Sequence, residues 1–333
     1  MKPELINFVE KFKGKRILII GDMIADIYLK GDISRISREA PVLVLIESEE
    51  KTVAGGAANV VNNVATLGGK AFAVGILGED KGALNLKQIL EENNVNTEGM
   101  FCDKNRKTIT KTRVIAGGRA TVSQQVVRID RECNEVISEI YEKELMNYIQ
   151  MVMPQMQGVV MSDYGSGTIT PKIRDLILSL SKEYDIPSII DSRYAIFNFV
   201  GTDYSKTNDA ELASAVGYKI DNEEILYKAA QEFLVKMQAK GILVTRGEKG
   251  MTLFEANGDV HNIPVSDKSE VFDVSGAGDT CVATFITALA TGAMPSQAAE
   301  LSNFASGIAV RKMGTATVSD EELIAVLKKY NYR

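Results

Sequence analysis

The segment of this sequence best suited to chemistry is Asp273–Thr280, which reads DVSGAGDT and leads directly into an apolar helical pattern. Gly276 and Gly278 permit a tight turn that exposes backbone amides, including that of Ala277, at the positive end of the helix dipole. Such amides predict a site for the negative charge of a phosphate. A carboxylate at Asp279 would repel that phosphate unless it took a proton from an attacking hydroxyl. A glycine turn with an aspartate that only caps the helix explains the same residues equally well.

A second glycine pair, Gly55 and Gly56, precedes another helical pattern, and Asn59 follows three residues later. The glycines permit close approach of the backbone to a polyhydroxy ligand, and the Asn59 side chain offers both a donor and an acceptor. Taken alone, these residues favour a tight turn followed by an ordinary helix cap.

Two aspartates, Asp22 and Asp26, follow the first apolar run, Arg16–Ile20. Ligands of open α/β sheets gather beyond the C-terminal ends of the strands. Asp26 could therefore bind a pair of sugar hydroxyls. A solvated aspartate in a loop is an equally good interpretation.

Two later segments have residues that suit a nucleotide and its metal. Asn208 and Glu211 stand three apart at a predicted helix start, where they could hold magnesium and its waters near phosphates. An N-cap with an acidic first turn explains them about as well. Thr245, Gly247 and Gly250 lie between two predicted strands, where glycines could admit a nucleotide, although a hairpin turn is the simpler interpretation.

The elements that must position these residues alternate between strands and helices. Compact apolar runs, typical of buried parallel strands, occur at 16–20, 71–76, 158–161, 188–190 and 241–245. Apolar residues at helical spacing mark Ala57–Leu67 and Val282–Leu289, the second ending near Gly292. Further helical patterns cover about 141–153, 171–184, 222–239, 295–312 and 319–330. This alternation predicts a three-layer α/β/α sandwich with a mostly parallel central sheet.

Two stretches, residues 27–53 and 107–129, contain short strands with no helix between them. They predict a small β-sheet that packs on the main domain as a lid, although an antiparallel extension of the main sheet remains an alternative. No repeat or proline-rich linker divides the chain. We therefore expect one domain over residues 1–333 with a small appendage.

Composition excludes several classes of function. The 333 residues carry a net charge of −6 without a long basic run, so neither nucleic acid nor an anionic membrane is an expected partner. The one histidine, His261, lies in a predicted polar surface turn and excludes His-rich zinc sites. Three widely spaced cysteines without a CxxC motif indicate reduced thiols in a cytoplasmic protein. The N-terminal residues lack the apolar segment of a signal peptide. No stretch approaches the ~20 apolar residues that a membrane helix needs.

Several motifs of other enzyme classes are absent as well. The sequence has no GxxxxGK[ST] phosphate loop and no His-Arg-Asp loop of protein kinases. No GxGxxG motif follows the first strand, which argues against a dinucleotide-dependent oxidoreductase.

In this order, the motifs resemble those of the ribokinase-like (phosphofructokinase-B) family of sugar kinases. The resemblance covers roughly residues 15–320, and the two characteristic family segments match Gly55–Asp80 and Asp273–Asp279. Within the family, the chain is most similar to D-glycero-D-manno-heptose 7-phosphate kinases, which act in ADP-heptose synthesis. That closer similarity is carried by residues 21–26, 34–42, 55–60, 161–165 and 312–318.

The resemblance implies a reaction and a role for each candidate residue. ATP would phosphorylate the anomeric hydroxyl of heptose 7-phosphate, giving heptose 1,7-bisphosphate and ADP. Asp279 would be the general base, beside an anion hole formed by the amides of Gly276, Ala277 and Gly278. The residues expected to hold the sugar are Asp26, Gly55, Gly56 and Asn59. Those expected to line the ATP–magnesium side are Asn208, Glu211, Thr245, Gly247, Gly250 and Asn303, with Glu211 holding the metal through water.

The resemblance also implies partners. The 7-phosphate needs cations, for which the candidates are Arg35, Arg38, Arg113, Arg119, Arg128 and Arg193, with Arg113 and Arg128 as the first choices. The lid is expected to close over the sugar and to pair two subunits as a homodimer. The HxGH motif of a fused nucleotidylyltransferase needs two histidines, so we expect a separate protein to take the product.

The alternatives differ in substrate or in class. A kinase of the same fold could act on another sugar, sugar phosphate or nucleoside. A non-catalytic regulator that binds a sugar or a nucleotide is a second possibility, but such a protein would have no need of a base at Asp279.

Overall fold

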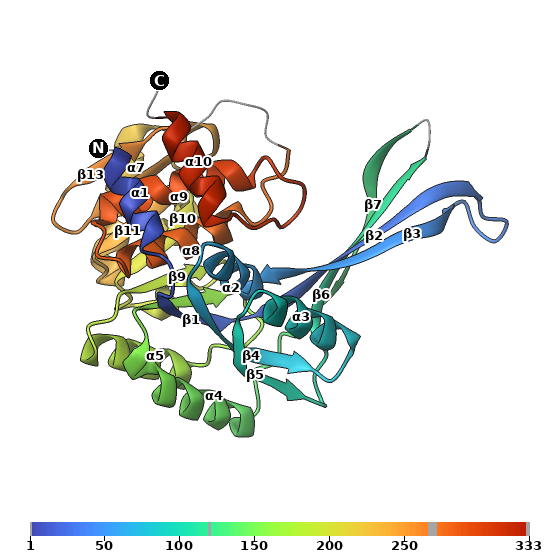
Figure 1. Cartoon of the computed structure of the whole chain (residues 1–333), viewed down its shortest axis with the longest axis horizontal. Helices are drawn as coiled ribbons and strands as arrows, with labels where there is room; N and C mark the ends of the chain where they lie inside the picture. The colour runs from blue at the N-terminus through green and yellow to red at the C-terminus, as the bar shows by residue number, and fades with distance from the viewer. Residues whose placement is uncertain (1, 119–120, 266–271, 331–333) are drawn as a thin grey trace.

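The computed structural model describes residues 2–118, 121–265 and 272–330 and contains two β-sheets of different size (Figure 1). The larger sheet has nine strands and lies between layers of helices. The smaller sheet has four strands and projects from this body as a long ribbon. The predicted sandwich with a separate smaller sheet is therefore confirmed, and the two sheets share no strand.

The large sheet has the strand order β13-β12-β11-β10-β9-β8-β1-β4-β5. Its strands are β1 (Arg16–Gly21), β4 (Lys70–Gly78), β5 (Asn96–Asp103), β8 (Gly158–Asp163), β9 (Ser188–Ser192), β10 (Tyr204–Asn208), β11 (Gly241–Thr245), β12 (Met251–Glu255) and β13 (Val260–Ile263). All neighbours from β5 to β11 pair in parallel, and only β12 and β13 are antiparallel. The five predicted apolar runs all lie in parallel strands of this sheet.

The predicted turn position of His261 is wrong. His261 lies in β13, opposite Leu253 of β12, and the turn falls earlier, at residues 256–258. The short sequence Val260–Ile263 has too few apolar residues to be distinguished from a turn without its partner strand.

The helices match the predicted patterns to within a few residues. They are α1 (Lys2–Glu10), α2 (Ala57–Thr66), α3 (Lys81–Glu92), α4 (Glu139–Val152), α5 (Pro171–Glu183), α6 (Asp209–Val216), α7 (Glu223–Met237), α8 (Ala277–Leu289), α9 (Pro295–Ala309) and α10 (Asp320–Tyr330). Helix α8 is capped at Ala290, two residues before Gly292, which has a φ of 88°. Helices α1 and α3 have no counterpart among the predicted patterns.

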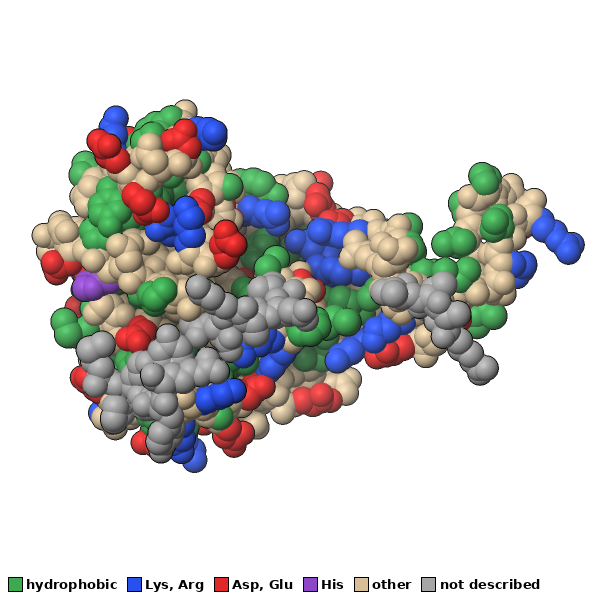
Figure 2. Space-filling model, turned by 90° about the horizontal axis from the view of Figure 1, so that it is seen from above, with side chains coloured by type: hydrophobic (Ala, Val, Ile, Leu, Met, Phe, Trp, Pro, Cys, Tyr) green, Lys and Arg blue, Asp and Glu red, His purple; other side chains and the backbone are tan. Residues whose placement is uncertain are grey.

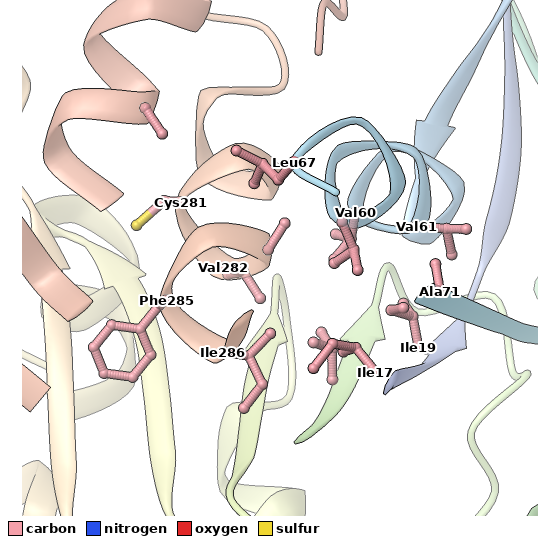
Figure 3. Close-up of a cluster of buried hydrophobic side chains, with 14 of the residues drawn as sticks. Ile17, Ile19, Val60, Val61, Leu67, Ala71, Cys281, Val282, Phe285 and Ile286 are labelled. Atoms are coloured by element: carbon pink, nitrogen blue, oxygen red, sulfur yellow. The ribbon is translucent and has the colours of Figure 1, made fainter. Parts of the chain in front are cut away.

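The hydrophobic core has two parts, one on each face of the large sheet. Because side chains alternate along a strand, Ile17 and Ile19 of β1 point to one face, and Leu18 and Ile20 point to the other. Figure 3 shows Ile17 and Ile19 below the apolar side of α2, with Val282 and Ile286 of α8 beside them. The core on the opposite face includes side chains of α4, α5 and α7.

The strand order reverses at β1, which lies between β4 and β8. In open parallel sheets, the carboxyl ends of the strands at such a switch point form the usual ligand crevice. Asp22 follows β1, and Asp163 ends β8, so both aspartates lie at this edge.

The small sheet has the order β3-β2-β6-β7 and grows out of the same edge. Strand β2 (Met23–Ile36) begins two residues after β1 ends, and β3 (Leu43–Gly56) returns to the start of α2. Strands β6 (Ile109–Gly118) and β7 (Thr121–Arg131) complete the sheet, with β6 parallel to β2. The predicted stretches 27–53 and 107–129 are the strands of this sheet, together with their connections.

The switch point depends on the absence of a side chain at Gly21. A Cβ there would lie 1.9 Å from the carbonyl oxygen of Ser162, its partner in β8. We expect Gly21→Ala to lower the free energy of unfolding by about 3 kcal/mol, the upper end for overpacking, as measured by urea denaturation.

The matched control is Gly217→Ala, which caps α6 with a φ of 82° and has no atom within 4 Å of the new Cβ. Its cost should be about 1 kcal/mol, from backbone strain alone. Equal losses in the two variants would contradict the close-contact explanation.

Candidate active site

A cavity of about 150 Å³ lies at the carboxyl edge of the large sheet. It is lined by residues from the ends of β8 and β9, from β10, and from the starts of α6 and α8: Asp163, Tyr164, Asp191, Arg193, Lys206, Glu211, Gly276, Gly278 and Asp279. Four of these residues carry carboxylates and two carry cations. The cavity is therefore lined mainly by charged groups, unlike the mostly apolar lining of a typical ligand pocket.

Asp279 lies in the first turn of α8 and is 6% exposed. Its Oδ2 accepts a hydrogen bond from Asn59 Nδ2 at 2.8 Å, and its Oδ1 accepts one from the Tyr164 hydroxyl at 3.0 Å. Burial raises the pKa of Asp279 to about 6, although the hydrogen bonds from Asn59 and Tyr164 act against that rise. The carboxylate is thus mostly ionised at neutral pH and is a stronger base than an exposed aspartate.

Asn59 is fully buried and belongs to a polar network between α2 and α8. Asn63 Nδ2 donates to Asn59 Oδ1 at 3.2 Å, and the Thr280 hydroxyl donates to Asn63 Oδ1 at 3.0 Å. These bonds fix the Asn59 amide with its nitrogen toward Asp279. The structure thus places Asn59 against the candidate base, and its predicted contact with a sugar stays a prediction.

Tyr164 was not assigned a role from the sequence, although it follows β8 directly. Its backbone N–H donates to Asp22 Oδ2 at 2.8 Å, and the N–H of Ser166 donates to the same oxygen at 3.1 Å. The buried Asp22 therefore holds the loop that carries Tyr164. Burial raises the pKa of Tyr164 well above its usual range, so the hydroxyl keeps its proton and remains a donor to Asp279.

A buried ion pair, Asp191 with Lys206, lies beside the glycines at the start of α8. Lys206 Nζ is 3.0 Å from Asp191 Oδ2 and would be 2.7 Å from a Cβ at Gly278. Burial acts to lower the pKa of Lys206, but the carboxylates of Asp191 and Glu211 outweigh it and raise that pKa. The ammonium is thus a fixed positive charge next to the predicted anion hole. The sequence gives no clear signal for Lys206, because its segment YSKTN has no apolar run that would mark a buried strand.

The predicted anion hole is only partly open in this structure. Gly276 has a φ of 78° and packs on Asn59 Nδ2, which a Cβ would approach to 2.7 Å. The Ala277 amide donates to the carbonyl oxygen of Val274 at 3.3 Å and would have to leave that oxygen to contact a phosphate. The roles of these amides therefore stay predictions.

The residues predicted to hold a sugar lie together where β2 and β3 leave the body. Asp26 is 3% exposed, forms an ion pair with Arg113 at 3.1 Å, and accepts a hydrogen bond from the Thr315 hydroxyl at 3.4 Å. A Cβ at Gly55 would lie 2.7 Å from the Asp26 carboxyl carbon. Gly56 has a φ of 53° and is the N-cap of α2, as the turn interpretation predicts.

The first-choice arginines have carboxylate partners already. Arg113 is paired with Asp26, and Arg128 Nη2 lies 2.6 Å from Asp130 Oδ2. Arg35 is exposed on β2, and Arg38 is exposed beyond the end of that strand. Arg119 lies outside the described residues, so the structure places only Arg193 of the remaining candidates at the cavity.

Asn208, Glu211 and Thr245, which are expected on the nucleotide side, form hydrogen bonds within the protein. Asn208 and Glu211 form a reciprocal capping box at the start of α6, with both hydrogen bonds 2.8 Å long. Thr245 donates to the carbonyl oxygen of Thr207 at 3.4 Å. The cap predicted for Asn208 is present, and Glu211 also reaches the cavity.

The other candidates for the nucleotide side are Gly247 and Gly250 in the β11–β12 connection and Asn303 in α9. Gly247 and Gly250 have φ values of 56° and 84°, and a Cβ at Gly250 would lie 2.1 Å from the carbonyl oxygen of Ile263. Asn303 Nδ2 donates to the carbonyl oxygen of Pro264 at 2.8 Å. These glycines thus serve a hairpin, and contact of any of these residues with ATP remains a prediction.

Two other features of the described residues stand apart from the cavity. Glu255, Asp259 and His261 bring their ligand atoms within 4.8 Å of one another on the β12–β13 hairpin, but none of them lines the cavity. Within the described ranges, every helix is too short or too polar to cross a membrane.

Comparison with known proteins gives a consistent result. The family model described as pfkB family carbohydrate kinase matches residues 15–322. The bifunctional protein HldE of Citrifermentans bemidjiense is 37% identical over 97% of this chain and 66% of its own length. The HldE of Desulfatibacillum aliphaticivorans is 39% identical over 96% of this chain and 64% of its own length. The chain thus spans about two thirds of the length of these curated relatives.

Solved structures share the fold at lower identity. Ribokinase of Arabidopsis thaliana, complexed with ribose and ATP, has a TM-score of 0.73 at 20% identity and covers 95% of this chain and 99% of its own. Phosphofructokinase-2 of Escherichia coli, in complex with substrates and products, has a TM-score of 0.75 at 19% identity, with coverages of 96% and 99%.

The hydrogen bond from Tyr164 predicts how the candidate base titrates. Because that bond stabilises the ionised carboxylate, Tyr164→Phe should raise the pKa of Asp279 above the value of about 6 in the native chain. The measurement is a carbon-13 NMR titration of the side-chain carboxyl groups, with the Asp279 signal assigned from its loss in Asp279→Asn. The control is Tyr28→Phe, which removes a hydroxyl that contacts Thr315 and not Asp279. An unchanged or lowered pKa in Tyr164→Phe would show that the bond does not tune the base.

Proposed function

The chain belongs to the pfkB family of carbohydrate kinases, and we propose that its substrate is D-glycero-D-manno-heptose 7-phosphate, phosphorylated at the anomeric hydroxyl. Family membership and the ribokinase-like fold make the protein an ATP-dependent sugar kinase. The heptose is supported by the similarity of its motifs to heptose 7-phosphate kinases and by its HldE relatives. The observation that carries the proposal is the buried Asp279 carboxylate beside the Lys206 ammonium and the glycines of α8.

Asp279 acts on the attacking hydroxyl. Its carboxylate takes the proton of the anomeric hydroxyl as the oxygen forms a bond to the γ-phosphorus of ATP. The bond from that phosphorus to the β–γ bridging oxygen breaks, and ADP leaves with the electron pair. Asn59 and Tyr164 each donate to one Asp279 oxygen, which orients the remaining lone pairs toward the cavity.

Lys206 and the start of α8 stabilise the charge that develops on the transferred phosphoryl group. The ammonium is held by Asp191 and cannot swing away, so it needs no reorganisation during the reaction. Gly278 leaves room beside it, because a side chain there would collide with Nζ. The helix dipole adds positive potential at the same position.

Magnesium fits the carboxylates of this cavity. Glu211 uses Oε2 for the Asn208 amide and reaches the cavity that Asp163, Asp191 and Asp279 also line. Carboxylate and water ligands are those that magnesium prefers, so Glu211 would hold the ion through water. When bound, the ion would neutralise charge on the ATP phosphates.

The sugar is assigned to the place where β2 and β3 leave the body. Asp26 is the acceptor for a pair of sugar hydroxyls, and Gly55 leaves space for its carboxyl group. The small sheet then acts as the lid over the sugar. The product would be passed to a separate nucleotidylyltransferase. The HldE relatives are named bifunctional, and this chain spans about two thirds of their length.

Loss of the base should abolish most of the turnover. We expect Asp279→Asn to lower kcat by about 10²–10⁴-fold or more, which corresponds to roughly 3–5 kcal/mol of transition-state stabilisation. The assay is ADP release with ATP, magnesium and a panel of heptose 7-phosphate, sedoheptulose 7-phosphate, fructose 6-phosphate, ribose and adenosine. Thermal unfolding of the variant is the control for folding.

The outcomes separate the parts of the proposal. Turnover restricted to heptose 7-phosphate and lost in Asp279→Asn supports both the substrate and the base. Turnover on another compound of the panel contradicts the heptose but keeps the mechanism. Near-normal turnover of Asp279→Asn refutes the assignment of the base.

The small sheet exposes apolar side chains that support a homodimer. Ile36, Ile46 and Ile129 are 66%, 62% and 58% exposed, and Figure 2 shows hydrophobic side chains along the projecting sheet. Soluble monomers rarely leave a large contiguous apolar patch in water. We assign this patch to contact with a second copy of the chain.

Ile46→Asp should therefore convert the dimer to a monomer, as measured by light scattering coupled to size-exclusion chromatography. The matched control is Val235→Asp on α7, which changes a residue that is 79% exposed outside the small sheet. A native chain that elutes as a monomer, or a control that dissociates equally, would contradict the assignment.

A further inference from the structure

Two cations close to the cavity form no ion pair with any carboxylate that the structure describes. Among the described residues, neither Lys111 of β6 nor Arg193, which follows β9, forms an ion pair; each lies instead over a tyrosine ring. Two arginines of the small sheet do have carboxylate partners, since Arg113 is paired with Asp26 and Arg128 with Asp130. In the part of the chain that the structure describes, neither cation thus has a carboxylate within ion-pair distance.

Both cations are close to the reacting end of the cavity. Lys111 Nζ lies 5.3 Å from the centre of the Tyr164 ring, and the hydroxyl of that same ring is bonded to Asp279. Arg193 lines the cavity together with Tyr164 and Asp279. Tyr164 thus contacts both groups: its hydroxyl donates to Asp279, and Lys111 lies over its ring.

The pKa of Lys111 is lowered overall, so its charged form is disfavoured where it lies. Burial lowers its pKa most, the charges of Arg128 and Arg193 lower it further, and the charges of Asp26 and Asp130 act in the opposite direction. A half-buried ammonium that faces other cations is unfavourable by itself. Such a cluster is stabilised when an anion of two negative charges lies between its members.

We propose that Lys111 and Arg193 bind the non-reacting phosphate of a phosphorylated sugar and so select it over the free sugar. This inference rests on the proposed sugar-kinase function and goes further, because it assigns the phosphate to two residues outside the first-choice pair, Arg113 and Arg128. Arg113 instead orients Asp26 toward the sugar hydroxyls. Arg193 offers a planar fork to two phosphate oxygens, and Lys111 offers a point charge.

The two residues come from different parts of the fold. Lys111 lies on the small sheet, and Arg193 follows a strand of the large sheet. Without an anion, their like charges repel each other. A phosphate between them replaces that repulsion with two attractions, so the phosphorylated substrate draws the small sheet toward the body and the free sugar does not.

The experiment compares heptose 7-phosphate with unphosphorylated heptose in Lys111→Gln and Arg193→Gln. Each variant should raise the KM for heptose 7-phosphate by about 10–100-fold, as expected for loss of one charged hydrogen bond. The kcat/KM for free heptose and the KM for ATP should stay within about twofold of the native values. Lys51→Gln, which changes an exposed lysine of the same sheet, is the matched control and should change nothing.

Equal losses on both sugars would overturn the proposal, because a general structural defect does not distinguish them. Unchanged kinetics in both variants would overturn it as well. If the native chain turns over neither sugar, the proposed heptose substrate fails, and a second measurement decides about the anion site. In a thermal-shift titration with inorganic phosphate, at saturating ADP and magnesium, phosphate should stabilise the native chain and Lys51→Gln but not Lys111→Gln. Absence of a phosphate-dependent shift in the native chain would refute the site.

Discussion

The hydrogen bond between Asn59 and Asp279 is the constraint around which the site is built. It joins the first turns of α2 and α8, which are 220 residues apart in the sequence, at a distance of 2.8 Å. A buried carboxylate is costly unless donors satisfy it, so the two helices must begin at the same point in space. Gly56 and Gly276 are the residues that allow this, because both are N-caps with positive φ and both lie against neighbouring atoms that would collide with a side chain. The two family segments are thus the two halves of one contact.

Near that contact, the negative charges of Asp279 and Asp191 are offset by the positive charge of Lys206. Asp191 is a second carboxylate near Asp279 and raises its pKa, while Lys206 compensates both. Because Lys206 is held by Asp191, the mechanism we propose gives the phosphoryl group a positive charge that is already in place. The protein bears the cost of burying this ion pair when it folds rather than at the moment of reaction.

The sequence predicts the parts of this fold that are determined locally. Strands such as Gly241–Thr245 and helices such as α8 have continuous or periodic apolar residues, and the structure contains them close to the predicted bounds. Strand β10, with the sequence YSKTN, has no such run, because it is a strand only through pairing with β9 and β11. The same strand carries Lys206, so the residue was missed for the same reason.

The site was predictable only in part, for a related physical reason. The glycines and Asp279 are neighbours in sequence, and their chemistry can be read from one segment. The contacts of Asp279 with Asn59 and Tyr164 depend on the strand order, which no local pattern records. Asn208 shows a further limit, because the capping box that explains it does not prevent Glu211 from also reaching the cavity.

Strand β2 has a consequence for how this protein can change during evolution. One strand of 14 residues carries Asp26 near its start and the exposed Ile36 at its end, and β3 returns directly to the cap of α2. The small sheet is therefore not a module that could be inserted, lost or exchanged at loop boundaries, since any cut that removes it also removes Asp26, to which we assign the sugar. The residues near Asp26 and those on the outer surface of the sheet lie on the same strands. Both sets must therefore diversify by point substitution, without changing the length or register of those strands.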